Sequence, residues 1–261
     1  AEEWGLSLHE GFCLCPKAGP ILHMRDVLAF KRLFAKGDVD IVHCHRSHDH
    51  TLAALARPRA GRVKLLRTLH TDRAAAPSRH WQLKRADALI CVHRAMRDEL
   101  RGRKLLAPKR IIAIEGAVDA ELYRPREAGG LAEELGLADD ALLVGMVARL
   151  TEGRGHGMRL DAWTRIAGDF PKAHLLLAGR GELEESLRAM GPVPRVHFVG
   201  YRRDLPQFYP ELDLKVMLEP GNDGTCRAAL EAMASGVPVL AAARGALAEI
   251  IDDGVDGMLV Q

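Results

Sequence analysis

Short apolar runs alternate with stretches of helical spacing along this chain, and the alternation occurs twice. Such alternation is typical of parallel sheets covered on both faces by helices, which bind ligands at the carboxyl ends of their strands. We therefore expect an α/β protein with two Rossmann-like parallel-sheet domains facing a cleft, over residues 1–115 and 141–261, joined by a Gly- and Pro-bearing linker at 116–140. The expected strands are 39–43, 63–69, 88–92, 110–114, 142–147, 174–178, 196–199, 212–218, 237–241 and 257–260, and the clearest helices are 26–34 and 95–101.

One block near the end of the chain, residues 222–240, combines a glycine-led loop with a short helix that carries an acid in its middle. Asp223 or Thr225 is expected to cap the first turn, and Gly236 to take the left-handed position after the last turn. Free amides at the N-terminus of this helix favour an anion. Glu231 offers a carboxylate to a sugar hydroxyl two turns further on, although an ordinary αβ unit with a solvated Glu231 is the alternative.

Composition and charge narrow the class of protein. The 261 residues are 48% hydrophobic and 28% charged, enough to bury one or two cores, and a net charge of +2 predicts no nucleic-acid partner. Five cysteines without a framework are typical of a reducing cytoplasm. No apolar run reaches membrane-spanning length. We expect a cytoplasmic protein, and peripheral contact with the inner face of the membrane stays open because residues 57–67 and 94–109 are locally basic.

A cluster of histidines surrounds one cysteine in the first half of the chain. His43, Cys44, His45, His48 and His50 are residue types that bind zinc. However, no second cysteine pair is placed to close a tetrahedral site, and polar residues at a strand end explain the cluster adequately. We therefore expect no metal.

Two phosphate-binding motifs are also disfavoured. Gly179 and Gly181 follow an expected strand, but Glu184 stands where a dinucleotide-binding fingerprint needs its third glycine. No Gly-Lys-Ser/Thr phosphate loop occurs anywhere in the chain. The sequence therefore argues against an oxidoreductase, an ATPase or a kinase.

The C-terminal block carries a resemblance to a known family. Asp223 and Glu231, separated by seven residues and followed by Ala-Met-Ala-Ser-Gly-Val-Pro-Val, resemble the acid-x7-acid motif of the retaining GT-B glycosyltransferases of family 4 (glycosyl transferases group 1). Other segments match this family in the same order: Asp40-Ile41-Val42-His43-Cys44-His45, Thr68-Leu69-His70-Thr71, Gly116-Ala117-Val118-Asp119 with Tyr123-Arg124-Pro125, Gly145-Met146-Val147-Ala148-Arg149-Leu150 with Arg154-Gly155, and the glycine-led segments 245–251 and 254–260. The resemblance also implies that the first strand and its glycine-rich loop, and the last helices of the family, are missing from this chain.

The resemblance implies a role for several residues on the donor side. Arg149 and Arg154, the latter where the family carries Lys, would bind the donor diphosphate and stabilise its departing charge without a metal. Glu231 would hold ribose hydroxyls, and Asp223, where most relatives carry Glu, would lie near the transferred sugar. The anion-facing backbone amides would be those of Gly224, Thr225 and Cys226.

Further residues fall at family positions for the nucleobase and the acceptor. Tyr201 and Arg202 follow an expected strand where the family recognises the base, largely through backbone groups. His70 ends a strand and would point into the cleft beside the acceptor and the reacting carbon, with a buried, satisfied histidine as the alternative.

The implied function is a hexosyl-type glycosyltransferase. It would move a sugar from a nucleoside diphosphate sugar, a UDP- or GDP-sugar being expected, to a glycan, lipid-linked or small-molecule acceptor, with retention and no cofactor. The acceptors of the family include cell envelope glycans. Two alternatives stay open: a sugar-nucleotide epimerase of the same architecture, and a non-catalytic fragment that binds sugar nucleotides.

Overall fold

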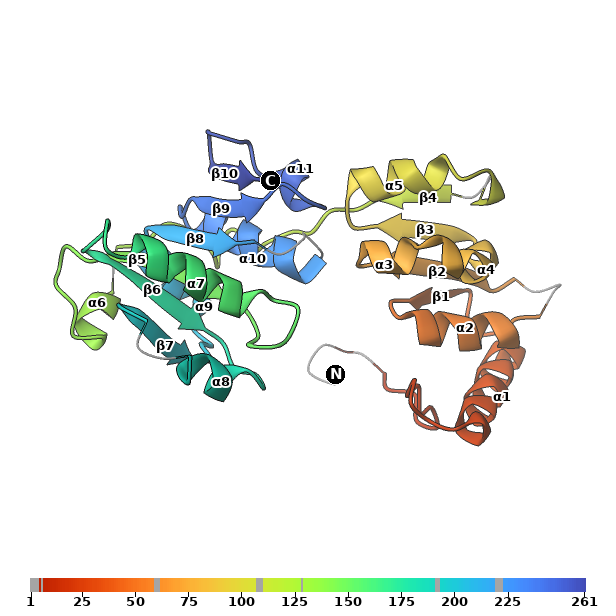
Figure 1. The fold of residues 1–261 in the computed structure, drawn as a ribbon. Coiled ribbons are helices and arrows are strands. Elements are labelled where there is room, and N and C mark those ends of the chain that lie inside the picture. Colours follow the sequence, from red (N-terminus) through yellow and green to blue (C-terminus); the bar gives the residue numbers. More distant parts are fainter. Residues whose placement is uncertain are drawn as a thin grey trace. The chain divides into compact units, whose positions relative to one another are not determined.

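The computed structural model describes residues 5, 7–58, 62–106, 110–127, 129–190, 193–218 and 223–261. The chain divides into two compact units, Ala1–Glu115 and Gly116–Gln261. Each unit contains one purely parallel sheet with helices against it (Figure 1). The expectation of two parallel-sheet α/β domains is confirmed.

The first unit contains a four-stranded sheet in the order β1-β2-β3-β4. Its strands are β1 (Ile41–Cys44), β2 (Lys64–Leu69), β3 (Ala88–Cys91) and β4 (Arg110–Ala113). The helices are α1 (Pro20–Lys36), α2 (Ser47–Ala56), α3 (Asp72–Ala75), α4 (His80–Arg85) and α5 (Arg94–Arg101), with short 3-10 turns at Pro77–Arg79 (η2) and Lys104–Leu106 (η3).

Two apolar clusters hold this unit together. Phe30 and Phe34 of α1 pack with Leu52 of α2 and Leu65 of β2 in one cluster. The other joins α4, α5 and strands β2 to β4, and includes Leu69, Leu83, Leu89, Met96, Leu100 and Ile111. Strands buried in this way need near-continuous apolar runs, which is why the hydrophobic pattern located them well.

The second unit contains a six-stranded sheet in the order β10-β9-β8-β5-β6-β7. Its strands are β5 (Leu142–Val147), β6 (Ala173–Ala178), β7 (Val196–Gly200), β8 (Leu214–Met217), β9 (Val239–Ala242) and β10 (Gly257–Val260). The helices are α6 (Leu131–Glu134), α7 (His156–Ile166), α8 (Glu184–Arg188), α9 (Leu205–Phe208), α10 (Asp223–Ala234) and α11 (Leu247–Ile250), with a 3-10 turn at Tyr209–Glu211 (η4).

The strand order of this sheet reverses between β5 and β8. From β5 the chain builds outward through β6 and β7, then returns to the other side of β5 and builds outward again through β8, β9 and β10. In open α/β sheets, ligands bind outside the carboxyl ends of the strands at such a reversal. The carboxyl ends of β5 and β8 are therefore the place to look for a site in this unit.

Some elements differ in extent from the sequence expectation. Helix α1 runs from Pro20 to Lys36, well beyond the expected 26–34, because proline suits the first helical position and Gly37, with φ 79°, ends the helix in the left-handed conformation. Helix α6 lies inside the expected linker, 116–140. Among the helices that the structure describes, none has the length and hydropathy needed to cross a membrane.

The segment before α1 is held by a buried side chain rather than by strand pairing. Residues 1–4 lie outside the described residues, and residues 7–19 form no strand. The amides of Cys13 and Leu14 donate to the two carboxylate oxygens of Asp26, at 2.8 and 2.9 Å, instead of to a neighbouring strand. This buried carboxylate therefore fixes the segment as an irregular loop.

Candidate functional site

Two arginines follow β5 at the point where the strand order reverses. Arg149 is exposed at the second position after the strand, and its carbonyl oxygen accepts a hydrogen bond of 2.9 Å from Nε2 of the buried His156. Arg154 is partly buried in the loop before α7. Both guanidinium groups thus lie in the loop that follows β5, where an anion would meet them.

The loop after β6 packs directly on the backbone that carries Arg149. Leu150 donates its amide to the Arg180 carbonyl and accepts from the Leu183 amide, both at 3.0 Å. A Cβ at Gly181 would lie 2.1 Å from the Leu150 carbonyl oxygen, and one at Gly179 would lie 1.9 Å from the Ala148 carbonyl oxygen. These two glycines therefore serve the close approach of two backbones rather than a dinucleotide fingerprint.

Helix α10 follows β8 and begins at Asp223. The side chains of Asp223, Gly224 and Thr225 lie outside the described part of the chain, so the contacts expected of them stay predictions. The side chain of Cys226 is buried in the core, which leaves only its backbone for a ligand. Gly236 adopts φ 82° after the last turn, as expected for a residue that ends a helix.

Glu231 is half-buried on α10, and two phenols hold its carboxylate. The hydroxyl of Tyr209 donates to Oε2 at 3.3 Å, and the side chain of Tyr123 also hydrogen-bonds to this carboxylate. Burial raises the pKa of Glu231, while the phenols, Arg227 and Lys215 oppose that rise. Glu231 is therefore a fixed, partly desolvated acceptor and not the solvated side chain of the alternative interpretation.

Lys215 is a fully buried cation that the sequence analysis missed. It lies in β8 at 0% exposure, and its Nζ donates to the Val147 carbonyl oxygen at 3.4 Å. Nζ also lies 5.8 Å from the centroid of the Tyr209 ring. A charged residue inside the apolar run 212–218 was the available signal, because lysine is almost never fully buried without partners.

The two candidate base-binding residues follow β7. Tyr201 is exposed. The guanidinium of Arg202 pairs with Asp204, Nη2 to Oδ2 at 2.8 Å, and with Glu134, Nη1 to Oε1 at 2.9 Å. The side chain of Arg202 is thus engaged with two carboxylates, and any base recognition at this position falls to its backbone.

In the first unit, His70 directly follows β2 and lies against a second histidine. Its Nε2 is 2.9 Å from Nδ1 of His45, and the two rings are stacked. His43 lies next to His45, with ring centroids 4.3 Å apart, and its Nε2 hydrogen-bonds to the Thr68 hydroxyl at 2.7 Å. The sheet edge therefore brings these histidines together, with ring nitrogens able to orient a hydroxyl or relay a proton.

The rest of the histidine cluster does not converge on one point. His50 is buried in α2, where its Nε2 donates to the Gln82 carbonyl oxygen at 2.9 Å. Burial raises the pKa of the Cys44 thiol to about 11, which disfavours the thiolate that zinc needs. Within the ranges that the structure describes, no group of three or more His, Cys, Asp or Glu side chains is placed to hold a metal ion.

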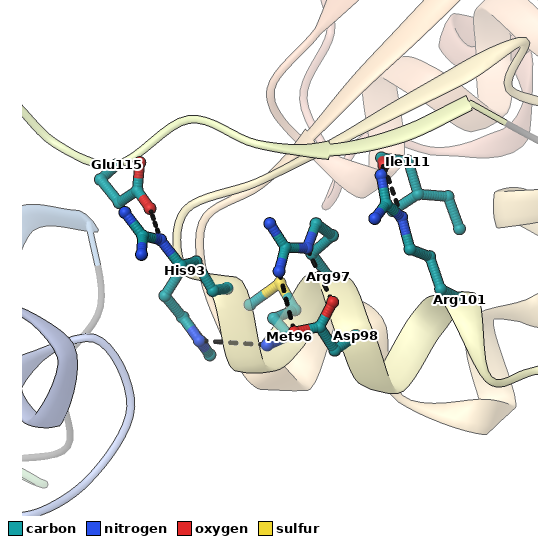
Figure 2. Close-up of polar contacts among 8 residues, drawn as sticks. His93, Met96, Arg97, Asp98, Arg101, Ile111 and Glu115 are labelled. Atoms are coloured by element: carbon teal, nitrogen blue, oxygen red, sulfur yellow. Dashed lines mark hydrogen bonds and ion pairs between the residues drawn. The ribbon is translucent and has the colours of Figure 1, made fainter.

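A second feature that the sequence analysis missed lies where β2 and β3 end. Nδ1 of the buried His93 accepts from the Met96 amide at 3.2 Å and caps α5 (Figure 2). The proton therefore resides on Nε2, which donates to Asp72 at 3.0 Å. At the far end of α5, Arg101 donates through Nε and Nη2 to the Ile111 carbonyl oxygen at 3.0 and 2.7 Å. Helix α5 is thereby fixed to β4, and Asp72 is held beside the end of β2.

The arrangement in the second unit has a definite chemical capacity. The loop after β5 offers two guanidinium groups for an anion, and α10, which follows the adjacent strand β8, offers a carboxylate for hydroxyl groups. This combination suits a ligand with both a phosphate and a polyol, and among the side chains that the structure describes it includes no nucleophile aligned with a base.

Comparison with known families covers both units. Residues 3–122 match the model of "Glycosyltransferase Family 4", and residues 141–261 match that of "Glycosyl transferases group 1". A D-inositol 3-phosphate glycosyltransferase of Actinosynnema mirum is 29% identical over 255 residues, covering 86% of this chain and 61% of the relative. The lipopolysaccharide core biosynthesis mannosyltransferase LpcC of Rhizobium leguminosarum is 29% identical over 261 residues, covering 94% of this chain and 70% of the relative.

Solved structures share the fold. HepE of Anabaena, solved with UDP and glucose, has a TM-score of 0.72 at 23% identity, covering 95% of this chain and 70% of that one. Sucrose-phosphate synthase of Thermosynechococcus elongatus has a TM-score of 0.74 at 22% identity, covering 94% and 68%. With its two units matched by the two models in order, the chain belongs to the family 4, group 1 glycosyltransferases, which have the GT-B fold.

Proposed function

We propose that this protein is a glycosyltransferase that moves a hexosyl group from a nucleoside diphosphate sugar to a hydroxyl acceptor, with retention at the anomeric carbon. The observation that carries the proposal is the position of Glu231. It is half-buried on α10, the helix that follows β8, and its carboxylate accepts a hydrogen bond from Tyr209. Arg149 and Arg154 follow β5, the strand next to β8 at the reversal of strand order. A carboxylate accepts hydroxyl groups, and guanidinium groups bind a diphosphate in forked geometry.

Each residue has a proposed role in this reaction. Arg149 and Arg154 bind the diphosphate and stabilise the charge that develops as it departs. Glu231 accepts the ribose hydroxyls, and Asp223 lies near the transferred sugar. The backbone amides of the first turn of α10 (Gly224, Thr225 and Cys226) face the phosphate, and the backbone at Tyr201 and Arg202 faces the base.

The proposed donor is a UDP- or GDP-sugar. HepE was solved with UDP and with UDP-glucose, which supports a uridine nucleotide. LpcC is named a mannosyltransferase, so the sugar of the donor is not restricted to glucose, and a GDP-sugar stays part of the proposal. No metal takes part in the proposal, because the guanidinium groups supply the positive charge.

The acceptor is proposed to be a polyol, a glycan or a lipid-linked sugar. The names of the relatives include an inositol phosphate and a lipopolysaccharide core. In this proposal residues 1–115 form the acceptor side, 116–140 the linker and 141–261 the donor side, with His70 beside the reacting hydroxyl. We propose that the protein acts in the cytoplasm, and at the inner face of the membrane if its acceptor belongs to the cell envelope.

Ligand-observed NMR against UDP-, GDP-, ADP- and CMP-sugars tests the donor site. We expect saturation transfer to one nucleotide class and a roughly 10- to 100-fold weaker affinity in Glu231→Gln, since hydrogen bonds to a charged group are worth about 1.5–3 kcal/mol. Glu185→Gln, an exposed glutamate of α8, is the matched control and should bind as the original chain does. Equal binding by Glu231→Gln would refute the assigned site.

Product analysis then separates the reaction classes. A transferase releases nucleoside diphosphate only when it has an acceptor or water to attack. An epimerase converts the sugar nucleotide without any acceptor, and a binding protein leaves it unchanged. Inversion at the anomeric carbon of the product would overturn the proposed retention.

A further inference from the structure

The buried lysine of β8 lies beneath the candidate ribose-binding carboxylate. Lys215 is fully buried on the same face of β8 as Met217, which packs against α10 and Tyr209. Its Nζ reaches the Val147 carbonyl oxygen at the carboxyl end of β5, at 3.4 Å. The cation thus sits inside the strand reversal rather than on the surface.

The Tyr209 ring connects this cation to the carboxylate. Nζ of Lys215 lies 5.8 Å from the ring centroid, and the hydroxyl of the same ring donates to Oε2 of Glu231 at 3.3 Å. The ring of Tyr123 packs 6.1 Å from that of Tyr209 and adds a second phenol to the carboxylate. The order from the core outward is therefore ammonium, phenol and carboxylate.

A charge in this position lowers the stability of the fold, because the protein interior solvates an ammonium group poorly. Taking an ion out of water carries a large desolvation penalty that other groups must offset, so packing alone does not account for Lys215. Glu231, in turn, is partly desolvated, and burial favours the protonated acid. A protonated carboxyl loses acceptor capacity for two ribose hydroxyls.

We propose that Lys215 is a positioning residue for the donor site, which keeps Glu231 ionised and, together with Tyr209, oriented to accept hydroxyl groups. This role rests on the proposed function, in which Glu231 binds the ribose. Lys215 itself does not touch the ligand. Its contribution is the opposite charge that offsets the desolvation of the carboxylate.

Within the described part of the chain, the charged and titratable groups that act on Glu231 come from four places. Tyr209 extends from η4, Lys215 from β8, Tyr123 from the segment before α6, and Arg227 from α10 itself. Arg227 is exposed, so water screens its charge, whereas Lys215 is shielded from water. Both cations lower the pKa of Glu231, Arg227 more than Lys215, and of the two only Lys215 is enclosed in the core.

The test is an NMR titration of the ligand-free protein with ¹³C-labelled glutamate carboxyls. The Glu231 signal is assigned by its loss in Glu231→Gln. In Lys215→Met, we expect the Glu231 midpoint to rise by about one pH unit, the scale produced by loss of a nearby opposite charge. Lys172→Met removes an exposed lysine, paired with Asp140 at 2.6 Å, and should leave that midpoint unchanged.

Two outcomes would overturn the inference. Equal midpoints in Lys215→Met and in the original chain would mean that the lysine does not sustain the carboxylate charge. A rise of the same size in Lys172→Met would mean that general charge, not the buried position, is responsible. Should Lys215→Met not fold, Tyr209→Phe keeps the ring, removes the donated hydrogen bond and should raise the Glu231 midpoint as well.

Donor binding separates this inference from the proposed function. We expect the affinity for UDP-glucose to decrease as the pH is lowered from 8 to 5, and to do so at a higher pH in Lys215→Met than in the original chain, because Glu231 takes up its proton earlier. The diphosphate diester does not titrate in this range, so the change reports on the protein. A purely structural role would weaken binding equally at every pH. If the NMR midpoint moves but neither protein binds any nucleotide sugar of the panel, the charge network stands and the proposed donor site fails.

Discussion

Replacing Gly181 by Ala tests whether the loop after β6 positions the arginine loop after β5. The new Cβ would lie 2.1 Å from the Leu150 carbonyl oxygen and 2.5 Å from its carbonyl carbon. Both atoms belong to backbone, which cannot rotate away as a side chain end can. The two loops must therefore separate.

The structure gives the size of the effect. Insertion of a methyl group into a packed site costs about 1–3 kcal/mol through strain and shifted backbone. Separation also weakens the hydrogen bonds of the Leu150 amide and carbonyl, with Arg180 and Leu183, each worth about 1 kcal/mol. We expect a loss of about 2–4 kcal/mol in the free energy of unfolding, together with weaker donor binding because Arg149 shifts.

Urea unfolding followed by circular dichroism measures this loss, with calorimetry for donor binding. Gly168→Ala is the matched control: nothing lies within 4 Å of its Cβ and its φ is not positive. That variant should change the free energy of unfolding by less than about 1 kcal/mol, in the stabilising direction. If Gly181→Ala is as stable as Gly168→Ala, the close approach of the two loops does not constrain the fold.

Three further predictions concern stability. Burial would raise the pKa of Asp87, but the amide of Leu65 in β2 and the guanidinium of Arg57 outweigh burial and hold this pKa low. Asp87→Asn should therefore lower the free energy of unfolding in urea by about 1–2 kcal/mol at pH 7. The difference should shrink as the pH falls below about 4, and a difference that is constant with pH would contradict the ion pair. Nδ1 of His174 lies 3.0 Å from Nε2 of His197. Burial lowers the pKa of both histidines, and the charge of His197 also lowers that of His174. The unfolded chain therefore binds protons at a higher pH than the folded chain, so the melting temperature should fall as the pH drops below about 6.5, less steeply in His197→Gln. Parallel curves for the two proteins would refute this. Gly236→Ala should lower the free energy of unfolding by about 1–2 kcal/mol, because φ is 82° at this position and the side chain of Pro125 lies 3.2 Å from the new Cβ. An unchanged midpoint of urea unfolding would contradict the left-handed end of the helix.

The hydrophobic pattern located the strands because parallel strands covered on both faces need continuous apolar runs. It did not locate α3, η2 and α4, which divide residues 72–85 into elements of six residues or fewer. Such short elements lack the two or three turns over which helical periodicity is detected, and tertiary contacts decide them. The two ends of α1, by contrast, have local signals in the sequence, Pro20 and Gly37, although the expected helix covered only 26–34.

The site divides in the same way. Glu231 and Arg149 could be nominated from the sequence because a spaced motif marks each of them along the chain, and their roles stay predictions. The His93 and Asp72 contact joins residues 21 positions apart, and only the pairing of β2 with β3 brings them together. Lys215 was missed for a related reason: one charge inside an apolar run does not show which face of the strand it occupies, or that a phenol from η4 will cover it.

The strand reversal also makes the second sheet a structure of two halves. Strands β5, β6 and β7 meet strands β8, β9 and β10 along a seam with only two register pairs, Val144 with Leu214 and Gly145 with Lys215. Asp213 adds two hydrogen bonds to Leu143 across 70 residues of sequence: its side chain accepts from the Leu143 amide at 2.7 Å, and its own amide donates to the Leu143 carbonyl oxygen at 2.9 Å. Nζ of Lys215 also donates to the Val147 carbonyl oxygen across the seam.

Contacts between segments this distant form late in folding, because the intervening chain must close first. The seam should therefore be among the last parts of the sheet to form, visible during refolding as late protection of the amides of 143 and 213 from hydrogen exchange. A nucleotide bound across the seam would fasten one half to the other, so donor concentration would set how often the sheet comes apart.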